Sequence, residues 1–122
     1  MSKPKIVAEF ITDSRGRPQF FEGSARKHYR IRLLLRDVPS DVSRVTYKLD
    51  ESYRQPLCEV PIGVPEFQEE ITSFGDFTVT AMVRRRAGTD LVTNSLSAAL
   101  NETYRDNATP SVREAMDRLQ SG

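Results

Sequence analysis

The chain is poor in the residues that build disulfide frameworks and metal centres. It has one cysteine, Cys58, one histidine, His28, and no tryptophan. A single cysteine excludes an internal disulfide, and one cysteine with one histidine does not make up the ligand set of a zinc site. We therefore expect no metal and no cofactor, and we expect Cys58 to be a small buried strand residue rather than a reactive thiol.

Charge of one sign and long apolar runs are scarce as well. Among 122 residues, 18 Lys and Arg stand against 17 Asp and Glu, a formal net charge of +1. This balance gives no general attraction to nucleic acid or to an anionic membrane. No apolar run approaches the ~20 residues of a membrane-spanning helix, and residues 1–5 do not resemble a signal peptide. We expect a cytoplasmic protein with a single core.

Motifs of catalysis are missing too. The chain has no phosphate-binding loop, no dinucleotide fingerprint and no nucleophile elbow around a serine. No pair of carboxylates is placed for general acid–base chemistry. His28 falls on the outward side of a predicted strand beside Lys27 and Arg30, where a solvated surface histidine is the expectation. The sequence therefore favours a binding protein over an enzyme.

Alternation of apolar and polar residues with a period of two dominates the rest of the chain. It is clearest over residues 27–36 and 42–50, which we expect to be strands with one buried face. Further strands are expected over residues 5–12, 57–62, 66–72, 74–86 and 91–104. Residues 87–90 form a predicted hairpin turn, in which Gly88 supplies a positive φ. The expected fold is all-β, an antiparallel sandwich of about seven short strands.

One short helix is predicted near the C-terminus. Pro110 suits a first helical position, and Ser111 with Glu114 matches a capping box. Apolar residues then follow at helical spacing and form one stripe: Val112, Ala115, Met116 and Leu119. The stripe predicts packing on the sheets, a linker or a partner contact. We therefore divide the chain into a β domain over residues 1–106 and a helix or linker over residues 107–122.

Three loop regions carry candidate binding residues. The basic run Arg84–Arg86 suits a phosphate or an acidic peptide, although a solvated strand end is the simpler explanation. Residues 50–56 leave a strand with a hydroxyl and an aromatic ring. Residues 73–77 place a glycine between two aromatic residues, which indicates a bulge or a close approach by another group. On composition alone, these rings are explained by capping of the core.

Together, the last two regions resemble the YEATS domain family, in particular its prokaryotic branch. The family has a strand of the form Lys-Val-x-Phe-x-Leu-His-x-Ser-Phe followed by a proline. This chain has Arg44-Val45-Thr46-Tyr47-Lys48-Leu49-Asp50-Glu51-Ser52-Tyr53, with Pro56 after it. The family then has Pro-Phe followed by Gly-Trp-Gly-Glu-Phe or Gly-Tyr-x-Gly-Phe. Here the matching stretches are Val64-Pro65-Glu66-Phe67 and Ser73-Phe74-Gly75-Asp76-Phe77, so order and spacing agree over residues 21–104.

The resemblance implies an immunoglobulin-like β-sandwich with an aromatic slot at one end, which in eukaryotic members binds acetyl-lysine or flat acyl-lysines such as crotonyl-lysine. Carried over by position, Ser52 would hydrogen-bond the acyl amide, and Tyr53 and Phe74 would flank the acyl group. The backbone N–H of Phe74 or Gly75 would donate to the amide oxygen. Asp50 stands where the family has a supporting histidine.

The resemblance thus implies a non-enzymatic module that binds an acylated lysine of a protein or peptide, or a similar modified peptide. The upstream loop lacks an aromatic residue that often closes the slot, for which Phe20 or Phe21 is a substitute. The alternative is a protein–protein interaction or sensor domain of a prokaryotic signalling or defence-type system. Such a domain would act through a sheet face or the 111–119 helix, without acyl-lysine binding.

Overall fold

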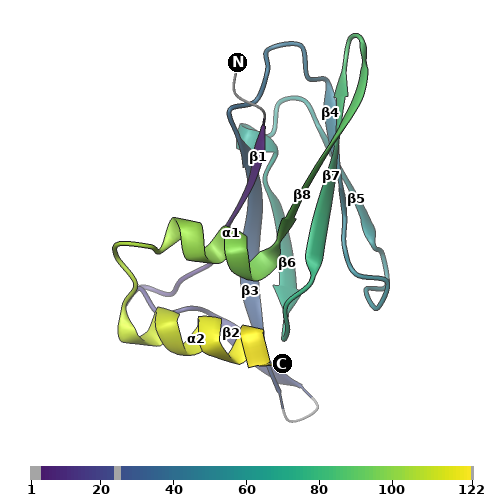
Figure 1. The fold of residues 1–122 in the computed structure, drawn as a ribbon. Coiled ribbons are helices and arrows are strands. Elements are labelled where there is room, and N and C mark those ends of the chain that lie inside the picture. Colours follow the sequence, from purple (N-terminus) through teal and green to yellow (C-terminus); the bar gives the residue numbers. More distant parts are fainter. Residues whose placement is uncertain (1–3, 24–25, 122) are drawn as a thin grey trace.

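A computed structural model describes residues 4–23 and 26–121 and shows a mostly antiparallel β protein with two short helices (Figure 1). The elements follow one another as β1 Lys5–Phe10, β2 Phe20–Gly23, β3 Arg26–Arg36, β4 Arg44–Lys48, β5 Leu57–Pro61, the 3₁₀ helix η1 Pro65–Phe67, β6 Glu69–Ser73, β7 Thr78–Arg85, β8 Gly88–Ser95, α1 Leu96–Thr103 and α2 Pro110–Ser121. The all-β expectation is confirmed at this level. Neither helix is long and apolar enough to cross a membrane within the described part of the chain.

The strands form two four-stranded sheets that share one core. In the first sheet β3 is central: β1 and β2 pair with successive parts of one edge, and β6 pairs with the other. The second sheet has the order β5-β4-β7-β8. Alternate residues of both sheets point inward, for example Ile31 and Leu33 of β3 and Val45 and Tyr47 of β4, and all belong to a single buried cluster. Burying each such side chain contributes about 1.5–3 kcal/mol.

The strand expected over residues 27–36 is confirmed, with one difference on its outward face. Leu34 belongs to the polar side of the alternation, yet only 2% of it is exposed. It lies opposite Val7 of β1, which is buried as well. The uninterrupted apolar run Leu33-Leu34-Leu35 has the composition of a strand segment buried on both faces.

The strand predicted over residues 91–104 is wrong beyond Ser95, where α1 begins. Ser95 caps this helix: its Oγ accepts a hydrogen bond from the Ala98 N–H at 3.1 Å. Leu96, Ala99 and Leu100 are buried at helical spacing. The alternation of Leu96, Ala98 and Leu100 matches a strand equally well, and a short apolar run does not distinguish the two by period.

The predicted C-terminal helix is present as α2, but its cap is a different residue. Thr109 Oγ1 accepts from the Val112 N–H at 3.3 Å, whereas Glu114 of the expected capping box pairs with Arg118 one turn further on. Val112, Ala115 and Leu119 are buried in the same cluster as the sheet residues. Figure 1 shows α1 and α2 on the same side of the molecule. The helix is therefore packed on the core and does not extend from it.

Several strand ends differ from the periodic pattern for local reasons. The strand expected over residues 66–72 begins at Glu69, because Pro65 starts the short η1 helix. The strand expected from Phe74 begins at Thr78, which leaves 74–77 as a loop.

Cys58 lies in β5 as expected but is only half-buried. Burial raises the pKa of its thiol, which keeps the sulfur protonated at neutral pH.

Candidate functional site

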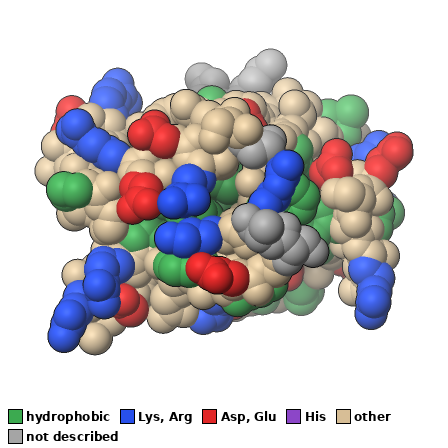
Figure 2. Space-filling model, turned by 90° about the horizontal axis from the view of Figure 1, so that it is seen from below, with side chains coloured by type: hydrophobic (Ala, Val, Ile, Leu, Met, Phe, Trp, Pro, Cys, Tyr) green, Lys and Arg blue, Asp and Glu red, His purple; other side chains and the backbone are tan. Residues whose placement is uncertain are grey.

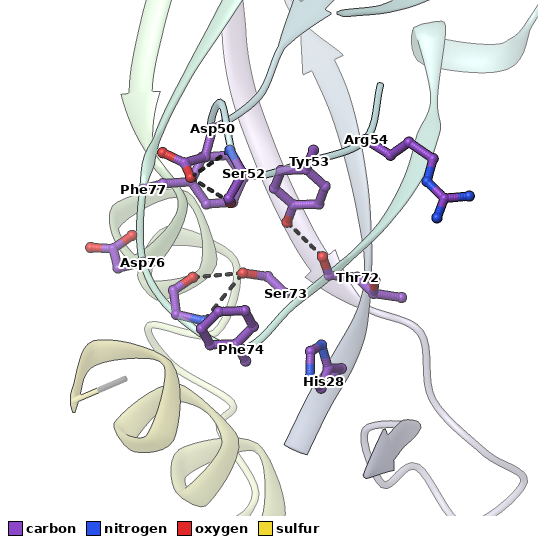
Figure 3. A pocket seen from close by; sticks show the side chains of 11 residues that line it. His28, Asp50, Ser52, Tyr53, Arg54, Thr72, Ser73, Phe74, Asp76 and Phe77 are labelled. Carbon is purple, nitrogen blue, oxygen red and sulfur yellow. Dashed lines mark hydrogen bonds between the residues drawn. The ribbon is translucent and has the colours of Figure 1, made fainter. Parts of the chain in front are cut away.

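The β4–β5 and β6–β7 loops meet at one end of the two sheets and enclose an open cleft. Its volume is about 390 Å³. The cleft is lined by His28, Asp50, Ser52, Tyr53, Arg54, Thr72, Ser73, Phe74, Gly75, Asp76 and Phe77 (Figure 3). All five residues singled out in the sequence, at positions 50, 52, 53, 74 and 75, line this one cleft.

The β4–β5 loop is folded around the side chain of Asp50. Leu49 N–H donates to the Pro56 carbonyl at 2.7 Å, which closes the loop. The Ser52 hydroxyl and the Ser52 N–H both donate to Asp50 Oδ2, at 2.5 and 3.2 Å. These two bonds favour the charged form and hold the pKa of Asp50 below its usual value. Ser52 is therefore held in place as an acceptor, because its only proton is already donated.

Tyr53 is anchored to the neighbouring sheet. Its hydroxyl donates to the Thr72 carbonyl at 2.5 Å, and its ring lies 5.5 Å from the Phe77 ring at an angle of 59°. Burial raises the pKa of this hydroxyl, so it remains a donor well above neutral pH. Tyr53 thus forms one wall of the cleft in a fixed position.

Of the two backbone donors expected in the β6–β7 loop, Phe74 and Gly75, the Gly75 N–H is used within the loop. That N–H donates to Ser73 Oγ at 3.3 Å, while the Ser73 hydroxyl donates to the Gly75 carbonyl at 2.6 Å. The N–H and the carbonyl of Gly75 are therefore both hydrogen-bonded to Ser73 within the loop. The Phe74 N–H remains as the candidate donor to a ligand oxygen.

Asp76 fastens this loop to the start of α1. Its two carboxylate oxygens accept from the N–H and the hydroxyl of Ser97, at 2.9 and 2.7 Å. The first turn of a helix has unpaired N–H groups and a partial positive charge, so a carboxylate stabilises it. The sequence motif marks Asp76 only as part of a loop, because its partner belongs to a helix that the periodic pattern did not predict.

Phe74 and His28 form the opposite wall. The two rings are 5.0 Å apart at 61°, and His28 also stacks on Phe21 at 4.9 Å and 11°. His28 lies on the outward face of β3 as expected, but it is half-buried because Phe21 and Phe74 pack on its ring. Of the two residues suggested as a substitute for the missing aromatic, Phe21 packs on His28 at the cleft and Phe20 packs on Tyr29.

Charge around the cleft is divided between its two sides. Figure 3 shows Asp50 and Asp76 on one side and Arg54 on the other. Figure 2, which views the molecule from below, shows acidic and basic side chains interspersed on that face. A uniform field of one sign is therefore absent from this view, in agreement with the small net charge.

The basic run Arg84–Arg86, the other candidate site of the sequence, has its central arginine in structural ion pairs. Arg85 of the basic run lies between Asp41 and Asp90, at 3.0 and 3.3 Å. Over residues 4–23 and 26–121, no group of three or more His, Cys, Asp or Glu side chains is placed to hold a metal ion.

A comparison with models of known protein families and with curated proteins finds no match to this chain.

Proposed function

We propose that the chain is a YEATS-like module with an immunoglobulin-like sandwich fold that binds an acylated lysine and catalyses no reaction. The observation that carries the proposal is the Ser52–Asp50 pair at the cleft. Because the Ser52 proton is donated to Asp50, the lone pairs of Ser52 Oγ are free to accept the N–H of an acyl-lysine amide. The family motifs in the sequence support the same assignment, and a prokaryotic cytoplasm is the location that we propose with it.

The aromatic walls suit a flat, uncharged acyl group. Tyr53 packs on Phe77 and Phe74 packs on His28, so each wall ring has its own neighbour and the space between the walls stays open (Figure 3). Acylation removes the lysine charge, so the rings need not desolvate an ammonium group. Each ring contact contributes about 0.5–1.5 kcal/mol beyond area burial, which suits an affinity on the order of micromolar.

The carboxylates at the cleft make the comparison with unmodified lysine decisive. Asp50 and Asp76 would attract a lysine ammonium, whereas the aromatic walls favour the acyl group. The proposal therefore requires that the acyl contacts outweigh this attraction.

Titration of three peptides of one sequence, with acetyl-lysine, crotonyl-lysine or unmodified lysine, tests the proposal by NMR. We expect shifts of the residue 50–56 and 73–77 amides that saturate at lower concentration with the acylated peptides. Phe74→Ala should abolish the difference, while Leu91→Ala, at an exposed strand position away from the cleft, should not change it. Equal binding of all three peptides, or no binding, would refute acyl-lysine recognition.

The alternative function, a protein–protein interaction domain in a signalling or defence-type system, is favoured by a separate observation. Leu57 and Leu91 are exposed, and the pairing of β5-β4-β7-β8 places both on the face away from the core. A partner contact through the α2 helix, the other form of this alternative, has less support, because Leu119 of α2 is buried in the core. An interaction through the sheet predicts that Leu91→Asp, and not Tyr53→Ala, abolishes binding of a co-purifying partner.

A further inference from the structure

Three rings form a continuous row from the cleft across the first sheet. Phe21 of β2 is the cross-strand partner of His28 of β3, and the two rings are stacked 4.9 Å apart. The pairing of β3 with β6 extends to Tyr29 and Ser73, so Phe74 follows beside His28, with ring centroids 5.0 Å apart. We call Phe21, His28 and Phe74 the ring row. Because neighbouring strand residues alternate, the row lies on the face opposite Tyr29, away from the core.

The ring row is ordered by its own contacts and yet open to solvent. Phe21 is 52% exposed and Phe74 is 42% exposed, although both rings pack on His28. Gly23 leaves room for this arrangement, because a Cβ there would lie 3.3 Å from His28 Nε2. Rings that are already ordered lose little conformational entropy when a partner covers them.

A cation without a carboxylate partner stands at the cleft end of the row. The guanidinium carbon of Arg26 lies 5.2 Å from the centre of the Phe74 ring. Among the described residues, Arg30 and Arg32 of the same strand pair with Glu70 and Glu9, whereas no ion pair involves Arg26. An arginine held over a ring and making no ion pair among the described residues is complementary to a carboxylate of a partner.

We propose that the ring row is a second subsite, which binds an aromatic side chain and an adjacent acidic side chain of the peptide that carries the acylated lysine. This inference rests on the proposed function, because the row begins at Phe74, a wall of the cleft. The aromatic side chain stacks on Phe21 and His28, and the acidic side chain pairs with Arg26. Two ring spacings of 5.0 and 4.9 Å correspond to about three residues of extended chain. The aromatic residue therefore lies two or three positions from the modified lysine.

The chain supplies matched controls on the other face of the same hairpin. Phe20 is 44% exposed and packs on Tyr29, and the ammonium of Lys27 lies 4.5 Å from the centre of the Phe20 ring. Phe20 and Lys27 thus repeat the ring-and-cation chemistry of Phe21 and Arg26, but away from the cleft.

The test measures dissociation constants by fluorescence anisotropy for labelled crotonyl-lysine peptides of equal length. The reference peptide carries Phe and Asp after the modified lysine, and two others replace Phe by Ala or Asp by Lys. We expect loss of the peptide Phe to weaken binding about three- to tenfold. Phe21→Ala should remove that difference and Phe20→Ala should keep it. Arg26→Glu should reverse the preference for Asp over Lys, while Lys27→Glu should leave it unchanged.

The outcomes separate the subsite from the function on which it rests. If no acylated peptide binds, both fail. If the three crotonyl peptides bind with equal affinity, or if Phe20→Ala and Phe21→Ala act alike, the subsite is refuted and acyl-lysine binding stands. If a single-stranded oligonucleotide displaces the reference peptide from the wild type and not from Phe21→Ala, the row binds nucleobases and the peptide subsite is refuted. Amide spectra of each variant confirm the fold; Phe20, Phe21 and Arg26 are exposed and Lys27 is half-buried.

Discussion

The hydroxyl of Ser52 donates to the carboxylate of Asp50 across 2.5 Å, which leaves the serine oxygen as an acceptor at the edge of the cleft. The YEATS family, which the sequence resembles, has a histidine at the matching position, whereas in this chain a carboxylate orients the serine. A carboxylate at this position affects both the affinity for an acylated peptide and the selectivity over unmodified lysine.

Asp50→Asn should change the two lysine forms differently. An asparagine oxygen can still accept from Ser52, so binding of the acylated peptide should weaken only about two- to threefold. Binding of the unmodified peptide should weaken more, because the attraction between carboxylate and ammonium is lost. Titration calorimetry with both peptides measures the ratio. A selectivity that falls in Asp50→Asn would contradict this role of Asp50.

The pH dependence of acyl-peptide binding follows from the same carboxylate. The pKa of Asp50 is lowered by the hydrogen bonds from Ser52, so the charged form persists below the ordinary aspartate pKa of about 3.9. Affinity should be constant through neutral and mildly acidic pH and fall only as the pH drops through the lowered pKa. In Asp50→Asn this decrease should disappear. A decrease that persists in Asp50→Asn would contradict this assignment.

Tyr53→Phe should reduce stability modestly. The substitution removes the 2.5 Å bond to the Thr72 carbonyl and keeps the ring on Phe77. We expect the free energy of unfolding to decrease by about 0.5–1.5 kcal/mol, measured by urea denaturation. Ser43→Ala serves as the control, because Ser43 is exposed and its long 3.5 Å contact to the Arg84 carbonyl should contribute little. Equal effects of the two substitutions would show that the Tyr53 hydroxyl does not anchor the loop.

All four tyrosines should resist ionisation in the folded protein. Burial raises the pKa values of Tyr29, Tyr47, Tyr53 and Tyr104, most strongly for Tyr47. A raised folded-state pKa stabilises the fold fully below the unfolded value of about 10, and this stabilisation is lost as pH rises toward the folded value. Phenolate absorbance at 295 nm should therefore lag behind that of the protein in denaturant. A normal titration of all four residues would contradict the buried environments.

Leu119→Ala should test whether α2 belongs to the fold. Leu119 is 1% exposed within the common core, so its truncation should cost about 2–5 kcal/mol. Arg118→Ala, on the exposed side of the same turn, should cost much less, because surface ion pairs contribute little. Chemical denaturation compares the two. Equal and small effects would restore the interpretation of residues 107–122 as a linker.

The sheets were the part of the fold most open to prediction from sequence. Strands such as β3 and β4 alternate over several residues, and the pattern survives because one face is buried and the other is not. The α1 helix was not predicted, because its apolar residues fit both periods. The contacts that start it are the Ser95 cap and the distant Asp76 carboxylate. The second of these depends on tertiary structure.

The sequence indicated the two loop motifs that line the cleft, but not the ring row that continues from it. The resemblance pointed to Ser52, Tyr53 and Phe74, and all three line one cleft. The ring row depends on the register of β2 and β6 against β3. A shift of one residue would turn Phe21 to the other face and bring Phe20 in its place, and the local sequence does not determine that choice.

The bond between Tyr53 and Thr72 has a further consequence for the behaviour of the protein at high concentration. In the described residues β6 pairs only with β3, so its other side presents unpaired backbone groups. The Tyr53 hydroxyl donates to one of these groups, the Thr72 carbonyl. Exposed strand edges recruit other chains and start aggregation. The tyrosine that forms a wall of the cleft thereby also limits self-association, and its loss should shorten the time before the protein precipitates.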